Sequence, residues 1–360
     1  MSYEEHEPQA AEPEDLLTNH SSGRGQGQVP FRKGNTGKPM KDENPANLKN
    51  MFTGSFPLPA GTEPHLRASL DRVLSNPGNL IRPQIVARMF AAYGLPAAHA
   101  AQLGIALEYF HTASLLFDDL PSMDDATERR GVPATHIEFG ESGAILTALA
   151  LINRAYALTW KSVAGCAAIS SDPSRQSHAL DYLERYLGVG GLLNGQSMDL
   201  NYPSLLLKNQ RKDHHVTEAI AIGKTVALIR LTLVLPGILG AASPRELQLL
   251  DRVALTWGLT YQIVDDLKDV LHTSEKSGKT VSRDLSMGRP NIALAIGIPS
   301  AVQRLTRLIS IGDRMLQRLV DLRPPVTFLQ ELRAQLDAEA NEIIYYAAER
   351  SRPTSLQGAA

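Results

Sequence analysis

The chain has 360 residues but a single cysteine, Cys166. A lone cysteine cannot form a disulfide within the chain, so a disulfide-stapled scaffold is excluded. The residues around Cys166, from Ala164 to Ala168, are small and apolar. We therefore interpret Cys166 as a core residue rather than a reactive thiol, in a protein suited to a reducing cytosol.

A strong net charge is also lacking. Lysine and arginine number 36 and aspartate and glutamate 38, which gives a net charge of −2. Together with the absence of a basic, aromatic-rich stripe, this balance argues against a nucleic-acid partner. Long apolar runs are scarce as well: the best candidate, Ala219–Ala242, is interrupted by Lys224, Arg230 and Pro236. A membrane span needs ~20 predominantly apolar residues, so we expect no transmembrane segment.

The first 50 residues contain few aliphatic side chains and many Gly, Pro, Asn and Gln residues. Such a segment cannot bury enough apolar surface to offset its ordering entropy. We predict a disordered tail over residues 1–50, with a partner-binding arm as the alternative, ahead of one domain over 51–360. Glu4, Glu5 and Glu7 precede the first basic residue, Arg24. That charge order is wrong for a secretory or transit peptide, so we expect a cytoplasmic protein.

From about Glu63 onward the chain has a helical pattern. Apolar residues recur three or four positions apart, as in the series Leu66, Leu70, Val73 and Leu74. No alternating strand pattern and no fixed repeat emerges, so the sequence predicts an all-α fold, a single large helix bundle. Further helices are expected over Ala97–Leu120, Ala144–Val163, Ser177–Leu193, Val216–Leu239, Pro244–Leu271, Pro299–Leu322 and Thr327–Glu349. Helices should break at prolines, here Pro133, Pro173, Pro203, Pro236, Pro290 and Pro324–Pro325.

Two clusters of acids interrupt this apolar pattern. The first comprises Asp118, Asp119, Asp124 and Asp125, and the second comprises Asp265, Asp266 and Asp269. Carboxylates this close repel one another near a core unless a positive charge holds them. A divalent cation such as Mg²⁺, which binds a few carboxylates together with substrate phosphates, is the usual solution.

The spacing within each cluster fits a shared site. Asp265 and Asp269 are four residues apart and therefore lie on one helix face. Asp118 and Asp124 are six apart, but Pro121 should end the helix and let the chain loop Asp124 back. Solvated acidic helix ends are the plainer reading of one such cluster, and a second cluster behind another apolar helix makes that reading weaker. Cations that could neutralise a substrate phosphate are nearby: Arg129, Arg130, Lys224, Lys279 and Arg289.

The stretch from about Asn79 to Asn291 resembles the trans-prenyltransferases, or isoprenyl diphosphate synthases, and within them the bacterial geranylgeranyl diphosphate synthases. Three sequence elements carry the resemblance: the two aspartate motifs, in order, and the Arg129-Arg130-Gly131 run after the first. It implies the isoprenoid-synthase helix bundle with a central active-site cavity. It also implies a homodimer and Mg²⁺-dependent condensation of an allylic diphosphate with isopentenyl diphosphate.

The resemblance further implies roles for single residues. The magnesium ligands would be Asp118, Asp124 and Asp265, supported by Asp119 and Asp269, with Asp266 also in the catalytic set. Arg129 would bind the allylic diphosphate and Arg130 isopentenyl diphosphate. Lys224 and Thr225 match a pair that contacts the allylic diphosphate, and Gln196, Asp199 and Gln262 match further elements of the family. Lys279, Asp284 and Arg289 resemble the segment that closes the site, where Arg289 replaces the usual lysine. Lys224 and Lys279 would act with the aspartates in catalysis.

The isopentenyl diphosphate site departs from the family in one residue. The family's Gly-Gly-Lys-x-x-Arg element corresponds here to residues 77–82, in which Arg82 is present but Asn79 replaces the lysine. A charged hydrogen bond is worth ~1.5–3 kcal/mol, so binding of this substrate should be weakened. His111, seven residues before Asp118, lies where relatives place another residue of this site, although a lone histidine on an apolar helix is normally a core residue.

The growing chain would occupy an apolar tunnel, with Ala113 and Ser114 in its upper wall. Both side chains are small, and by resemblance this favours a C20 product, geranylgeranyl diphosphate. Two alternatives stay open because of Asn79. One is a terpene-synthase-like enzyme that ionises and cyclises or hydrolyses a prenyl diphosphate without isopentenyl diphosphate. The other is a subunit of a heteromeric synthase.

Overall fold

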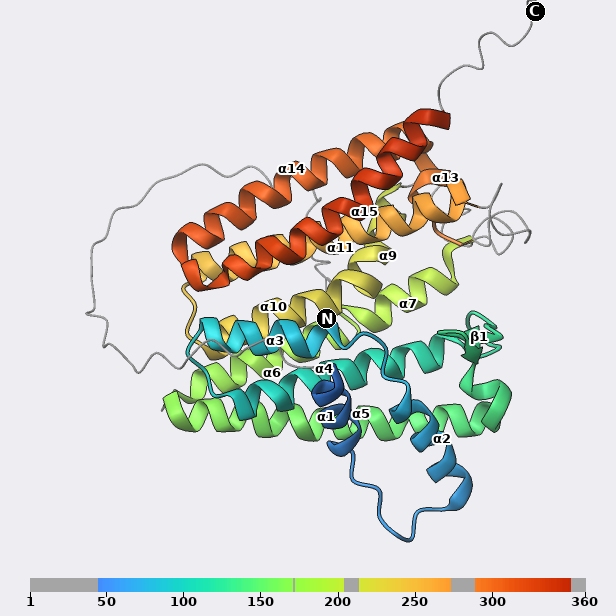
Figure 1. Cartoon of the computed structure of the whole chain (residues 1–360), viewed down its shortest axis with the longest axis vertical. Coiled ribbons are helices and arrows are strands. Elements are labelled where there is room, and N and C mark those ends of the chain that lie inside the picture. Colours follow the sequence, from blue (N-terminus) through green and yellow to red (C-terminus); the bar gives the residue numbers. More distant parts are fainter. Residues whose placement is uncertain (1–44, 171, 204–213, 273–288, 351–360) are drawn as a thin grey trace, which may run out of the picture. The chain divides into compact units, whose positions relative to one another are not determined.

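A computed structural model of the chain describes residues 45–170, 172–203, 214–272 and 289–350. Within these ranges the protein is almost entirely helical, which confirms the all-α prediction (Figure 1). The first half contains α1 (Pro45–Gly54), α2 (Pro64–Ser75), α3 (Ile81–Ala92), α4 (Ala97–Asp118), β1 (Glu128–Arg129), β2 (Val132–Pro133), α5 (Thr135–Ser170), α6 (Pro173–Leu187) and α7 (Leu192–Leu200). The second half contains α9 (His214–Ala221), the π-helix η2 (Ile222–Val226), α10 (Ala227–Leu239), α11 (Pro244–His272), α13 (Ile292–Ile296), α14 (Ile298–Leu322), the 3₁₀ turn η3 (Pro324–Thr327) and α15 (Phe328–Arg350).

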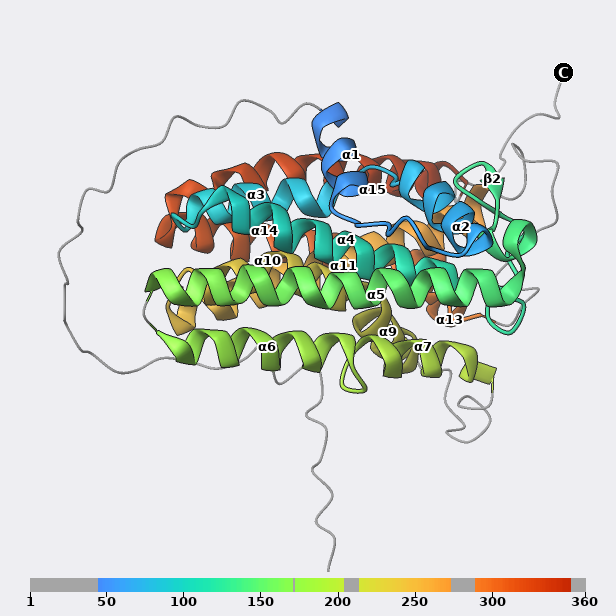
Figure 2. The same ribbon diagram turned by 90° about the horizontal axis from the view of Figure 1, so that it is seen from below.

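The long helices pack in layers, with α4 near the middle. Helix α4 contacts α3 on one side and α5 on another, and α10 packs between α6 and α11 (Figure 2). Helices α14 and α15 cover α11. The middle of α4 is apolar on nearly every face, and Leu103, Leu107 and Ala113 are fully buried. Helices α4 and α11 therefore carry both acid clusters on elements fixed by the core.

Local sequence explains where several helices begin. Ser243 and Glu246 form a capping box at the start of α11: the Ser243 N–H donates to Glu246 at 2.8 Å, and the Glu246 N–H donates to Ser243 Oγ at 3.2 Å. Glu63 caps α2 ahead of Pro64 by accepting the N–H groups of His65 and Leu66. Asn291 caps the short helix α13 by accepting the Leu294 N–H.

Some predicted boundaries were wrong. Helix α3 was not predicted, and it contains Pro83 in its first turn, where the missing N–H costs no helical bond. Pro236 does not end a helix but lies inside α10, which continues to Leu239. Residues 231–239 of α10 are all buried, so packing offsets the lost hydrogen bond. The expected lack of strands also fails at the small β1–β2 hairpin.

The segment His214–Leu239 is long and apolar enough to cross a membrane by length and composition alone. However, 61% of its most apolar window is buried inside the protein. It also contains Lys224, which pairs with an acid on another helix. In the fold, this segment is a core element made of α9, η2 and α10.

The predicted tail boundary at residue 50 was wrong, because α1 begins at Pro45. Its Leu48 is 2% exposed and its Phe52 is fully buried. The Phe52 ring meets Tyr109 of α4 edge-on, with 4.8 Å between ring centroids. The apolar spacing of Leu48, Met51 and Phe52, at i, i+3 and i+4, is the helical signal that the composition of the segment concealed.

Candidate active site

The first acid cluster lies where α4 ends. Asp118 is the last residue of α4, and the chain then turns so that the Asp124 N–H donates to the Asp118 carbonyl at 2.8 Å. Asp125, with φ of 47°, completes the turn in the left-handed region. Asp124 is thus brought back beside Asp118, as the position of Pro121 predicted.

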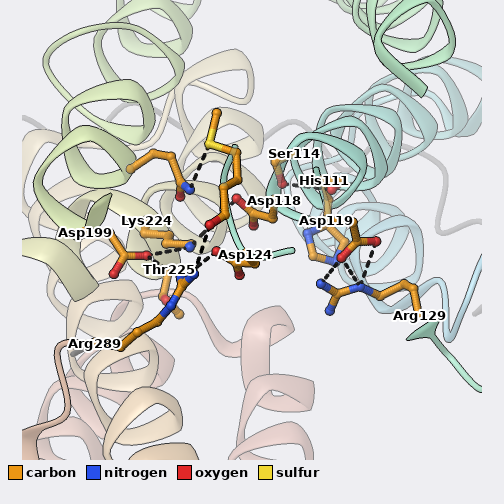
Figure 3. A network of polar contacts seen from close by, with 12 residues as sticks. His111, Ser114, Asp118, Asp119, Asp124, Arg129, Asp199, Lys224, Thr225 and Arg289 are labelled. Atoms are coloured by element: carbon orange, nitrogen blue, oxygen red, sulfur yellow. Dashed lines mark hydrogen bonds and ion pairs between the residues drawn. The ribbon is translucent and has the colours of Figure 1, made fainter. Parts of the chain in front are cut away.

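Asp118 and Asp124 face two cations and a third acid (Figure 3). Lys224 Nζ lies 3.8 Å from Asp118 and 2.7 Å from Asp199 of α7. Arg289 lies 2.5 Å from Asp124 and 3.7 Å from Asp199. Lys224, Asp199 and Arg289, all predicted site residues, therefore meet at the first cluster.

Asp119 points away from this group and pairs with Arg129 (Figure 3). Arg129 Nε donates to both carboxylate oxygens, at 2.9 and 3.2 Å, and its Nη2 donates to the first of them. Asp119 is only 2% exposed, so this pairing satisfies a buried carboxylate. As the structure stands, Asp119 positions Arg129 rather than facing Asp118 and Asp124.

The β1–β2 hairpin presents Arg130 to the substrate cavity. Arg130 and Gly131 are the two residues between the paired Arg129 and Val132, with φ of 55° and 73°. Positive φ at both central positions is typical of a type I′ hairpin turn. An arginine is strained in this conformation, and such strain is often kept at functional sites. The turn sends Arg129 and Arg130 to different partners, since Arg130 Nη1 donates to the Asn76 carbonyl at 2.9 Å.

The second acid cluster lies on α11 and divides into two kinds of residue. Asp265 is exposed and Asp269 is half-buried, one turn apart. Asp266 is 3% exposed. Its carboxylate accepts the Gln262 amide at 2.8 Å and the N–H of Ile292 at 2.7 Å. Asp266 therefore secures the start of α13, and its part in catalysis stays a prediction.

Gln262 links the second cluster to Thr225, the residue that follows Lys224. It accepts a 2.8 Å hydrogen bond from the Thr225 hydroxyl while it donates to Asp266. Lys224 and Thr225 lie in η2, the single π-helical turn between α9 and α10. Such turns are frequent at functional sites. The helix can pack against α7 here because Gly223 meets Gly195, where an added Cβ would come within 2.7 Å of the other backbone.

A second group of charges surrounds Glu108 of α4. Glu108 is 2% exposed, and Arg82 lies 3.4 Å from it. Burial raises the pKa of the Glu108 carboxyl, and the Arg82 and Arg130 guanidinium groups oppose that rise. Glu108 was missed in the sequence, where the signal was an acid three residues before His111 on an apolar helix. It balances the two arginines predicted to bind isopentenyl diphosphate.

His111 lies one turn after Glu108 and lines the same cavity. Burial, followed by the nearby Arg82, Arg130 and Arg129, lowers its pKa to about 2. The imidazole is therefore neutral at physiological pH. It can offer a phosphate a neutral hydrogen bond, but not a positive charge.

Several of these groups, among them Asp118, Arg130 and Lys224, border one cavity of about 1640 Å³. Typical small-molecule pockets measure ~300–1,000 Å³, so the space exceeds that of one small ligand. Its polar wall includes Asn79, Arg82, His111, Asp118, Arg130, Gln196, Lys224 and Thr225. Its apolar wall includes Phe110, Ile152, Tyr156, Leu187, Leu192, Leu228, Ile229, Leu233 and Trp257.

The structure places Ser114 and Ala113, both predicted for the tunnel wall, differently. Ser114 lines the cavity, whereas Ala113 is fully buried in the core and does not line it. Phe110, one turn before Ser114, lines it instead and packs edge-on against Tyr156 at 4.9 Å between ring centroids.

Lys279 and Asp284, predicted to belong to a segment that closes the site, lie outside the described residues. Lys49 and Met123 also line the cavity and were not predicted as site residues. The Met123 carbonyl accepts a 3.3 Å hydrogen bond from Arg289, a backbone role that no side-chain motif could indicate.

The carboxylates present suit a hard divalent cation. Burial raises the pKa of Asp118 to about 6; the Lys224 ammonium opposes the rise, and the Asp124 and Asp199 carboxylates add to it. Three carboxylates, Asp118, Asp124 and Asp199, face two cations, Lys224 and Arg289. Among the described residues, no three His, Cys, Asp or Glu side chains form a complete metal cage. Partial carboxylate sites that need substrate oxygens as further ligands are usual for Mg²⁺.

Comparison with known proteins identifies the family. A profile of the Polyprenyl synthetase family matches residues 63–316. Geranylgeranyl pyrophosphate synthase 10, mitochondrial, of Arabidopsis thaliana is 32% identical over 272 residues, covering 75% of this chain and 77% of the relative. Geranylgeranyl pyrophosphate synthase 6, mitochondrial, of the same plant is 32% identical over 67% of this chain and 70% of its own length.

Solved structures show the same fold. An FPP/GFPP synthase from Zymomonas mobilis superposes with a TM-score of 0.63 at 23% identity, covering 78% of this chain and 94% of its own. A geranyltransferase from Helicobacter pylori, complexed with magnesium and isoprenyl diphosphate, gives 0.64 at 22% identity, with coverage of 83% and 95%. The fold and site are those of a trans-prenyltransferase. The chain belongs to the polyprenyl synthetase family of trans-isoprenyl diphosphate synthases.

Proposed function

We propose that this prenyltransferase condenses an allylic prenyl diphosphate with isopentenyl diphosphate and releases geranylgeranyl diphosphate. One observation carries the proposal: Asp118, Lys224, Arg82 and Arg130 line the same cavity as a long apolar wall. Groups suited to binding phosphate and Mg²⁺ thus border the same space as a wall suited to a hydrocarbon chain. The names of the Arabidopsis relatives support the C20 product.

The reaction needs charge stabilisation rather than a nucleophilic side chain. The allylic C–O bond breaks, and the leaving diphosphate keeps the electron pair while Lys224 and Thr225 hold it. The double bond of isopentenyl diphosphate, held by Arg82 and Arg130, then attacks the allylic carbon. The new C–C bond leaves a cation that loses a proton to the diphosphate. The apolar wall excludes the water that would otherwise trap the cation.

The proposed cofactor is Mg²⁺. The residues that would hold it are Asp118 and Asp124 at the first cluster and Asp265 and Asp269 at the second. Bound magnesium supplies Lewis-acid stabilisation of the charge that develops on the departing diphosphate. Asp119 and Asp266, each already bonded to a positioning partner, would orient the site around these four ligands.

The product length depends on the cavity wall. Ser114 is small and leaves room beside Asp118, while Phe110 and Tyr156 lie further along the apolar wall. Phe110 is eight residues from Asp118, a distance of about 12 Å along a helix. We propose that this aromatic pair, rather than Ala113, limits the chain.

A homodimer is the proposed assembly. Helix α5 exposes Ile145, Leu149, Tyr156 and Trp160, between 36% and 54% each, at spacings of four, seven and four residues. Apolar residues so spaced form one stripe of a helix, and contiguous exposed apolar surface marks an interaction site. One relative is named as the large subunit of a heterodimeric synthase, so a different partner is the alternative. Cytoplasmic location stays a prediction, since the relatives named above are mitochondrial.

Product analysis with labelled isopentenyl diphosphate tests the proposed function. With farnesyl diphosphate and Mg²⁺, a labelled C20 diphosphate should form only when both substrates are present. Consumption of farnesyl diphosphate without incorporation of label would instead indicate a cyclising or hydrolysing enzyme. No turnover of either substrate by the isolated protein would favour the role of a subunit.

A further inference from the structure

Among the described residues, four lysine and arginine side chains line the cavity, and one of them has no role in the proposed function. Arg82, Arg130 and Lys224 are assigned to substrate phosphates, and the fourth is Lys49 of α1. Lys49 is exposed. Within the part of the chain that the structure describes, its ammonium makes no hydrogen bond or ion pair.

Lys49 occupies a fixed position because α1 is anchored in the core. Leu48 and Phe52, four residues apart, form the buried face of α1, at 2% and 0% exposure. The Tyr109 hydroxyl of α4 donates a hydrogen bond to the Phe52 carbonyl. Lys49, next to Leu48, therefore belongs to a helix that packs on α4, the helix that carries Glu108 and His111.

The face of α1 that carries Lys49 lies against the C-terminal end of α2. Thr53, one turn after Lys49 and on the same face, donates to the Leu74 carbonyl at 3.1 Å. Two residues later, the Asn76 carbonyl accepts the guanidinium of Arg130. The residues that follow, including Asn79, line the cavity together with Lys49.

An exposed lysine is most often only solvated. Here, however, Lys49 lines the same cavity as Asn79, the position at which the lysine of the family is missing. Glu339, an exposed acid that lines the same cavity, is already paired with Lys268 at 2.8 Å. A lysine acts on phosphate as a point charge on a flexible stem, so it can reach one phosphate from a different backbone position.

We propose that Lys49 binds the diphosphate of isopentenyl diphosphate and supplies from α1 the positive charge that Asn79 lacks. This inference rests on the proposed function. It explains how the chain retains a condensing site without a lysine at position 79. It also gives α1, whose first six residues fall in the tail predicted to be disordered, a direct part in substrate binding.

Steady-state kinetics of the full chain with labelled isopentenyl diphosphate, farnesyl diphosphate and Mg²⁺ tests the role of Lys49. In Lys49→Gln, the KM for isopentenyl diphosphate should rise about ten-fold or more, as expected for one charged contact. The KM for farnesyl diphosphate and kcat should change by less than about two-fold, because a ground-state contact to one substrate is lost. Lys49→Arg should retain most of the affinity, and Lys161→Gln, an exposed lysine on α5 away from the cavity, should match wild type.

Asn79→Lys provides a second, independent measurement. In the wild-type background it should change the KM for isopentenyl diphosphate little, because Lys49 already supplies the charge. In the Lys49→Gln background it should restore the KM to within about three-fold of wild type, a non-additivity expected of two groups that share a partner.

The outcomes separate the inference from the proposed function. If wild type elongates farnesyl diphosphate and Lys49→Gln leaves the KM for isopentenyl diphosphate unchanged, the inference alone is overturned. Equal rises of the two KM values in Lys49→Gln would also overturn it. So would a lowered thermal midpoint of Lys49→Gln together with a failure of Asn79→Lys to restore the KM for isopentenyl diphosphate. If wild type incorporates no label, the proposed function fails and the inference fails with it.

Discussion

Asp118 and Asp119 are adjacent, yet their side chains serve different parts of the site. Asp118 is 13% exposed at the side chain and faces Lys224, whereas Asp119 is buried against Arg129. The sequence motif predicted both residues as metal ligands, because spacing alone cannot show which carboxylate already has a partner. The same limit applies to Asp265 and Asp266 on α11, where only the buried second residue holds Gln262 and the backbone of α13.

At this scale we expect Asp118→Asn and Asp265→Asn to lower kcat by about 10²–10³-fold. Each change removes a carboxylate that would hold Mg²⁺, and with it part of the stabilisation of the departing diphosphate; loss of one such stabilising group typically costs that much. Far-ultraviolet circular dichroism should stay unchanged, since neither carboxylate holds the core. Turnover should be measured at saturating Mg²⁺.

Asp125→Asn is the matched control. Asp125 is exposed beside Asp124, and its φ of 47° is one that asparagine tolerates. It should retain near-normal turnover. A variant at Asp118 or Asp265 that performs as well as this control would remove that aspartate from the catalytic site.

At the scale of elements, the sequence predicted most helices and both acid clusters, and it misjudged two kinds of feature. Packing decided the first kind: Pro236 stays inside α10 because its surroundings are fully buried. Side-chain direction decided the second, since Ala113 and Ser114 are neighbours on α4 but only Ser114 reaches the cavity. Neither outcome follows from local residue preference, because each depends on what the rest of the fold places next to the helix.

The wall of the cavity gives a prediction about product length. Ser114→Tyr should place a ring in the cavity and shift products to C15 or shorter, with a near-normal thermal midpoint. Ala113→Tyr should instead overpack the core and destabilise the protein by about 1–3 kcal/mol. Chromatography of the released prenyl alcohols and thermal unfolding distinguish the two. The same product profile in wild type and Ser114→Tyr would place the length limit elsewhere.

The contact between α7 and η2 gives a second prediction at this scale. In Gly223→Ala the new methyl group would lie 2.7 Å from Gly195 Cα and 3.0 Å from the Gly191 carbonyl. The helices must then separate, which should weaken the 2.7 Å contact between Lys224 and Asp199. We expect at least ten-fold lower kcat, with a lowered thermal midpoint.

Gly61→Ala controls for the effect of an added methyl group, because nothing lies within 4 Å of a Cβ at Gly61. It should resemble wild type in both assays. If Gly223→Ala also resembles wild type, close helix approach is not what positions Lys224.

For the whole molecule, the family and fold were predictable because the two acid motifs and the helical pattern can be recognised in short stretches of the sequence. The N-terminal boundary was not, since the apolar residues of α1 are few and the surrounding composition resembles a tail. The contribution of these residues to the core depends on tertiary packing, because Leu48 and Phe52 are buried in the core formed with α4.

The corrected boundary changes what truncation should do. A chain beginning at Glu43 keeps all of α1 and should fold and turn over normally. A chain beginning at Met51 loses Leu48, which is 2% exposed, and removal of a buried leucine side chain typically costs about 2–5 kcal/mol. Thermal unfolding of the two proteins should therefore differ clearly, and equal midpoints would mean that the first turns of α1 contribute nothing to the core.

The exposed apolar stripe of α5 gives a prediction about assembly. If the apolar stripe of α5 is buried between two copies, a charge in its middle must be desolvated or must prevent association. Leu149 is 50% exposed and central in the stripe. Leu149→Arg should therefore convert a dimer to a monomer in size-exclusion chromatography with light scattering. Leu322→Arg, at a 43% exposed leucine on α14, should stay dimeric. Because Tyr156 belongs both to the stripe and to the cavity wall, the monomer should also release a broader range of product lengths. A dimeric Leu149→Arg protein would assign the interface to another surface.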